Sequence, residues 1–111
     1  MGLAASQARL LMLVARKSDL ELNLQQVDQA RLQLANIVTR LFNAASNLEP
    51  ESAQAQQLQS QIAGIQATDK AFEIESRRVD TQHQAVQTEI ESVSKVISKN
   101  IESSFKLSGN A

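Results

Sequence analysis

Apolar residues recur at alternating spacings of three and four along almost the whole 111-residue chain. In the first half this repeat covers ten positions, of which eight are apolar: Leu10, Leu13, Lys17, Leu20, Leu24, Val27, Arg31, Leu34, Val38 and Leu41. In the second half it covers fifteen positions, of which ten are apolar: Leu58, Ile62, Ile65, Asp69, Phe72, Ser76, Val79, His83, Val86, Ile90, Val93, Ile97, Asn100, Ser104 and Leu107. A 3.5-residue repeat places its members on one helix face, called the seam below. The repeat therefore predicts two long helices, over about residues 3–46 and 51–107.

The repeat is interrupted once, at the hinge formed by Asn47, Leu48, Glu49 and Pro50. A residue before proline is biased away from helical angles, and proline suits the first position of a helix. A connection this short joins antiparallel neighbours. The predicted fold is therefore all-α: one long antiparallel helical hairpin, coiled-coil-like and oligomerising, with a frayed tail at residues 108–111. A kinked continuous rod is the alternative.

The first seventeen residues, MGLAASQARLLMLVARK, fit three interpretations. Residues 1–6 match an N-myristoylation pattern, which remains open as a short pattern match. The apolar run at residues 10–15 resembles the start of a signal peptide, but it is shorter than the ~7–15 residues of such a segment, and Arg16 and Lys17 follow it. Because the seam passes through this segment, we expect it to form the first turns of a helix. No stretch approaches the ~18–20 apolar residues that cross a bilayer, so no membrane partner is expected.

The composition gives little support to catalysis, metal binding or nucleic-acid binding. The formal net charge of -1 offers no general attraction for nucleic acid. The chain has no cysteine, which excludes disulfides and thiolate metal sites, and His83 is its one histidine. Paired carboxylates such as Glu73 and Glu75 point to different helix faces. We therefore expect no enzyme activity and no cofactor.

The predicted hairpin leaves apolar surface uncovered. Both helices rise about 1.5 Å per residue, so Leu3 is expected to lie opposite about residue 93, and the rest of the second helix overhangs by about 20 Å. The overhang is apolar, and the first helix also has more apolar width than one partner covers. Long exposed apolar patches usually mark interaction sites. The residues expected to form a self-assembly interface are Val86, Ile90, Val93, Val96, Ile97, Ile101, Phe105, Leu107, Leu11, Leu22, Leu32 and Ile37.

The polar residues on the seam of the second helix include Asp69, His83 and Asn100. Polar residues at such positions commonly fix register and partner number. We expect this role for all three. For His83 we expect a bond across the helix interface to Gln, Asn or a backbone carbonyl, with a pH-sensing role as the alternative.

The layout resembles the axial subunits of flagellar-type and type III secretion systems, and in size the small needle subunits. Those have a short Pro/Asn-containing turn, like NLEPES here, then a Gln/Leu-bearing helix, like AQAQQLQSQI, and an apolar C-terminal helix, like VSKVISKNIESSFK. The opening MGLAASQARLL also resembles small uncharacterised bacterial proteins. The resemblance implies a subunit that is exported without a cleaved signal and polymerises at the cell surface or outside the cell. It also implies that residues 86–107 line the inner contacts.

Two functions follow from these expectations. The first is a structural subunit that self-assembles through its apolar stripes into a helical filament or tube, with itself and a secretion chaperone as partners. The second is a coiled-coil adaptor or a small secretion-chaperone-like binding module of defined size, which would be cytoplasmic. A membrane-surface role for the N-terminal arm is a third, less supported interpretation.

Overall fold

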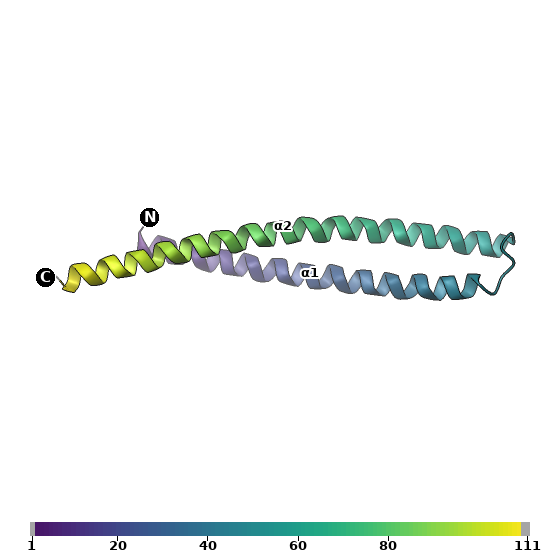
Figure 1. Ribbon diagram of the computed structural model, residues 1–111, viewed down its shortest axis with the longest axis horizontal. Helices are drawn as coiled ribbons and strands as arrows, with labels where there is room; N and C mark the ends of the chain where they lie inside the picture. The colour runs from purple at the N-terminus through teal and green to yellow at the C-terminus, as the bar shows by residue number, and fades with distance from the viewer. Residues whose placement is uncertain (1, 110–111) are drawn as a thin grey trace. The chain divides into compact units, whose positions relative to one another are not determined.

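The computed structural model describes residues 2–109 as an all-α helical hairpin (Figure 1). Helix α1 spans Leu3–Ala45 and helix α2 spans Ala53–Gly109. Two compact units each take a stretch from both helices. The terminal unit contains residues 1–22 and 79–111, and the loop unit contains residues 23–78. Ser108 and Gly109, from the expected tail, belong to α2, whereas residues 110–111 lie outside the described residues.

Helix α1 ends by hydrogen bonding its last carbonyl groups locally. The Ser46 amide donates to the Phe42 carbonyl at 2.9 Å, and the Ser46 hydroxyl donates to the Asn43 carbonyl at 2.8 Å. The Leu48 amide bonds the Ala45 carbonyl at 3.1 Å. These bonds satisfy carbonyls that have no partner within the helix. No residue among those described has a positive φ, so the end needs no left-handed cap.

Helix α2 begins two residues later than the sequence predicts, because Ser52 caps it and Pro50 does not. The Ser52 hydroxyl accepts the Ala55 amide proton at 3.1 Å, which is the bond that defines a helix N-cap. The Ser52 amide donates to the Glu49 carbonyl at 3.0 Å, so residues 49–52 form a turn with Pro50 at its second position. Proline favours that turn position through its fixed φ. The expected hinge therefore lies within a connection of residues 46–52.

The predicted seam is the core of the molecule. All ten seam positions of α1 are buried or half-buried, and so are the first thirteen of the fifteen in α2. The most deeply buried apolar side chains lie in both units: Leu13, Leu20, Val79 and Val86 in the terminal unit, and Val27, Ala55 and Ile62 in the loop unit. The 3.5-residue repeat thus describes how the two helices pack within one chain, which excludes the kinked rod.

Ion pairs show the antiparallel register. In the terminal unit, Arg9 Nη2 lies 2.6 Å from Glu89 Oε2. Because both helices have the same rise, this pair places Leu3 beside about Lys95, close to the predicted residue 93. Helix α2 runs on past the start of α1, as Figure 1 shows, and every residue from Ile101 to Leu107 is exposed. The overhang expected from the sequence is present.

Candidate functional site: apolar helix surfaces

The C-terminal part of α2 carries the most exposed apolar side chains of the chain. We call this the tail surface: Val96, Ile97, Ile101, Phe105 and Leu107. Phe105 is 78% exposed, Leu107 is 73% exposed and Ile101 is 51% exposed. At 3.6 residues per turn, the four charged residues of this segment occupy the opposite helix face: Lys95, Lys99, Glu102 and Lys106. The segment is therefore amphipathic, and its apolar side chains are exposed except for Ile97, which is half-buried.

A second apolar surface lies on α1, on the face away from the seam, within the terminal unit. We call it the outer α1 surface. Its two leucines, Leu11 and Leu22, are 72% and 54% exposed and lie three helical turns apart. The row that joins them alternates spacings of three and four, is exposed throughout and contains no charge: Ala4, Ala8, Leu11, Ala15, Ser18 and Leu22. Met12 and Val14 flank it and are also exposed. This row is a second heptad stripe.

The other residues expected at an interface lie elsewhere. Val86 is 5% exposed, and Ile90 and Val93 are half-buried, so the chain's own packing occupies these three side chains. Leu32 and Ile37 belong to the loop unit, where they are 64% and 40% exposed. Their helical positions point to different sides of α1, so they do not form one stripe.

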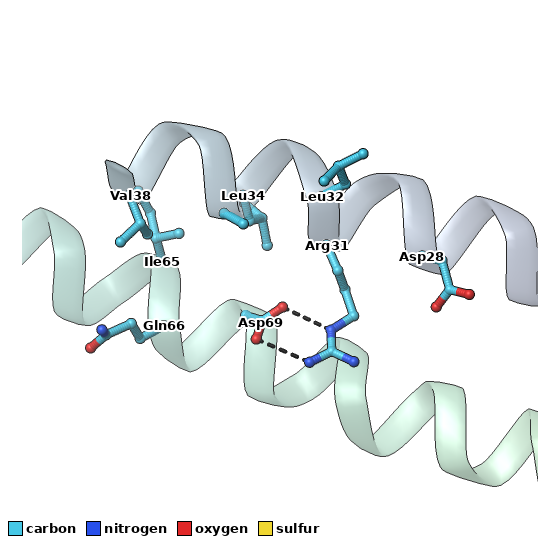
Figure 2. A pocket seen from close by; sticks show the side chains of 9 residues that line it. Asp28, Arg31, Leu32, Leu34, Val38, Ile65, Gln66 and Asp69 are labelled. Carbon is cyan, nitrogen blue, oxygen red and sulfur yellow. Dashed lines mark hydrogen bonds and ion pairs between the residues drawn. The ribbon is translucent and has the colours of Figure 1, made fainter. Parts of the chain in front are cut away.

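A groove in the loop unit runs beside the seam and has a volume of about 460 Å³ (Figure 2). Its apolar lining includes Leu34, Ala35, Val38 and Ile65. Figure 2 shows Arg31 reaching from α1 to Asp69 on α2, next to this lining. The groove is open along its length and combines apolar walls with one ion pair, a surface on which a third helix could lie.

The Arg31–Asp69 pair has the two-pronged geometry typical of arginine and carboxylate. Arg31 Nε donates to Asp69 Oδ1 at 2.9 Å, and Arg31 Nη2 donates to Oδ2 at 3.3 Å. These bonds lower the pKa of Asp69 from its ordinary value and raise that of Arg31. The sequence predicts a register-setting role for Asp69 on the seam but names no partner for it. A signal was available, since Arg31 is a seam residue of opposite charge on the other helix.

The seam histidine pairs with a carboxylate. His83 Nε2 lies 3.0 Å from Glu21 Oε1, and Lys17 Nζ approaches the same oxygen at 4.0 Å. The expected partner of His83, a Gln, Asn or backbone carbonyl, is therefore wrong. Glu21 lies beside the seam, where the 3.5-residue repeat alone does not find it. Asn100, the third predicted polar residue, is half-buried.

Nothing in the described part of the chain brings together a metal-binding group of three or more His, Cys, Asp or Glu side chains. No helix among residues 2–109 is long and apolar enough to cross a membrane. Comparisons with known protein families, with curated proteins and with solved structures found no match. The features with functional potential are thus the tail surface, the outer α1 surface and the groove.

Proposed function

We propose that this chain is a structural subunit that self-assembles through its apolar helix surfaces into a helical filament or tube. The observation that carries the proposal is the tail surface, where Phe105 and Leu107 are the two most exposed large apolar side chains among the described residues. Fully burying a side chain of this kind gains about 1.5–3 kcal/mol over leaving it in water. Association with a second copy of the same chain would provide that burial.

The outer α1 surface supports an extended assembly. A subunit with one adhesive surface pairs and stops, whereas two separate surfaces let it bind two neighbours at once. The tail surface lies on α2 and the outer α1 surface on α1, and the row joining Leu11 and Leu22 carries no charge that would oppose a neighbouring helix. The resemblance to needle-type subunits supports the same assembly, placed at the cell surface or outside the cell.

The test compares the purified wild-type chain with the double variant Ile101→Ser/Phe105→Ser. Sedimentation velocity over a range of concentrations and negative-stain microscopy measure assembly, and circular dichroism measures helicity. We expect concentration-dependent rods or tubes for the wild type. We expect their loss in the variant with most helicity retained, because both side chains are exposed in the single chain.

The matched control is Lys99→Ser/Glu102→Ser, which changes the opposite face of the same segment and leaves the net charge unchanged. It should assemble like the wild type. A wild-type chain that stays monomeric at every concentration would contradict the proposal, and so would a control that loses assembly as completely as the apolar variant.

The groove favours one second function, an adaptor or chaperone that binds a helix of another protein. Its apolar lining lies between stretches of α1 and α2 within the loop unit, where a client helix would complete a three-helix arrangement. A wild-type chain of one small, fixed size at all concentrations would support this function over a filament.

A further inference from the structure

The terminal unit carries two rows of side chains with the same alternating spacing of four and three. One is the start of the outer α1 surface: Ala4, Ala8, Leu11 and Ala15. The other, which we call the tail row, lies on α2 beside the seam: Ser94, Ser98, Ile101 and Phe105. Ser94 is half-buried, and the other seven residues are exposed. Neither row contains a charge, so each can form the face of a contact between helices.

The two rows are complementary in side-chain size when they lie antiparallel. The residues that then face each other, with the residue of a second copy given second, are Ser94–Ala15, Ser98–Leu11, Ile101–Ala8 and Phe105–Ala4. Every large side chain faces a small one, in both directions. Facing positions that alternate large and small residues interdigitate without leaving voids. The alanines of α1 thus offer the space that the two large side chains of the tail row need.

From this complementarity we infer that the tail row of one copy docks antiparallel on the outer α1 surface of the next copy. The contact is heterologous, because two different surfaces of the chain meet in it. Each copy can donate its tail row to one neighbour and receive the tail row of another. A heterologous contact repeats in this way into a ring or an open helical filament. The inference rests on the proposed self-assembly and names the contact that extends it.

The contact leaves the packing within each chain undisturbed. The Arg9–Glu89 pair places Ala4 beside about Ser94 of its own chain, whereas Ala4 of the next copy faces Phe105. Successive copies are therefore shifted by about 11 residues, or about 16 Å. At 3.6 residues per turn, the tail row lies about 80° around α2 from the seam, so the two α1 helices occupy different sides of α2. On α1, the outer surface faces away from the seam, so the neighbour's own α2 does not block it.

The residues that flank the two rows also fit this register. Ile97, which is half-buried, lies beside Val14 of the next copy, which is 45% exposed in the single chain. The next facing pair along the rows is Glu91 with Ser18, whose hydroxyl can donate a hydrogen bond to the carboxylate. No two like charges face each other across the rows or their flanking positions, so the register carries no charge repulsion there.

Because the chain has no cysteine, two introduced cysteines test the contact by cross-linking. The full-length variant Ser94→Cys/Ala15→Cys is equilibrated in a glutathione redox buffer and separated on a non-reducing denaturing gel. Within one chain the two positions lie about 16 Å apart along the helix axis, whereas the Cα atoms of a disulfide lie within ~7 Å. Between copies the two positions face each other. We expect a ladder of disulfide-linked dimers, trimers and longer species.

Each single variant should stay largely monomeric on the gel, because neither position faces itself. The matched control Lys99→Cys/Arg16→Cys places both cysteines away from the two rows and should give no ladder.

The inference is overturned if the double variant stays monomeric, if either single variant dimerises as readily, or if the control gives an equal ladder. Flotation of the chain with lipid vesicles in place of a ladder would also overturn it and assign the two rows to a membrane. Rods formed by the wild type without a ladder in the variant defeat only this inference. A ladder in the variant with a wild type that stays monomeric at every concentration defeats only the proposed function.

Discussion

The terminal unit and the loop unit are built from the same two helices but differ in what they leave exposed. In the loop unit the two helix stretches are joined by a hydrogen-bonded connection, and the capped start of α2 lies opposite the end of α1. In the terminal unit α2 outruns α1. Among the described residues, eight of the twelve large apolar side chains that are well exposed belong to the terminal unit: Leu11, Met12, Val14, Leu22, Val96, Ile101, Phe105 and Leu107.

The two units are alike in their internal packing but differ in the apolar surface that is available for association. Both units bury seam residues deeply, such as Val79 in the terminal unit and Ile62 in the loop unit. Only the terminal unit combines that core with two continuous apolar surfaces. Each unit also has a polar contact on its seam, Arg31–Asp69 in the loop unit and His83–Glu21 in the terminal unit. We therefore expect the loop unit to depend on its internal core alone, and the terminal unit to gain further stability from a neighbour.

Truncating one core residue in each unit gives the largest expected effect. Leu20→Ala and Ile62→Ala each remove a buried side chain, and each should lower the free energy of unfolding by about 2–5 kcal/mol. Urea denaturation followed by circular dichroism measures the loss at low and high protein concentration. Association stabilises the folded state by mass action. Higher concentration should therefore offset the loss in Leu20→Ala more than in Ile62→Ala.

The exposed substitution Gln25→Ala is the control and should change little at either concentration. If concentration has the same effect on both core variants, the terminal unit has no special role in association, and the contrast between the units fails.

Removing a buried hydroxyl should give the next largest effect. Ser6 is fully buried in the terminal unit, and its hydroxyl has no hydrogen-bond partner among residues 2–109. An unsatisfied buried polar group costs about 1–3 kcal/mol. Ser6→Ala should therefore raise the free energy of unfolding by about 1 kcal/mol or more. Ser18→Ala, an exposed change of the same kind in the same helix, should give only the smaller gain in helix propensity. Equal gains for both variants would show that burial of Ser6 carries no penalty.

The seam could be predicted from the sequence because a 3.5-residue repeat determines which face of each helix is apolar. The same repeat does not tell whether a residue is covered within its own chain or by another molecule, so the sequence predicts one interface for Val86 and Phe105 although Val86 is buried and Phe105 is exposed. Contacts between side chains beside the seam, such as Arg9–Glu89, depend on the exact register. Register depends in turn on the connection, where the Ser52 cap moves the start of α2.

Filling a glycine position tests the loop unit. Gly64 lies on an exposed part of α2, and a methyl group added there would meet no atom within 4 Å. Alanine is favoured over glycine in a helix interior by about 1 kcal/mol, so Gly64→Ala should raise the free energy of unfolding by that amount. The neighbouring reverse change, Ala63→Gly, should lower it similarly, as Ala63 is also exposed. Urea midpoints that do not move in opposite directions would show that this stretch of α2 does not limit stability.

Protonation of Asp69 at low pH should lower the free energy of unfolding of the loop unit. We expect this to be the smallest effect of the series, because the ion pair is partly exposed to solvent. Hydrogen bonds from Arg31 hold the pKa of Asp69 below its ordinary value of 3.8. A carboxylate with a lowered pKa in the folded state contributes stability above its unfolded pKa, and this contribution is lost as the pH falls through the folded pKa. The difference in unfolding midpoint between the wild type and Asp69→Asn should therefore stay constant from neutral pH down to about pH 5 and shrink below about pH 4. Arg31→Gln should give the same loss of pH dependence, because without the guanidinium nothing holds that pKa down. A midpoint difference that persists unchanged at pH 2 would show that the Arg31–Asp69 pair does not make the stability of the chain depend on pH.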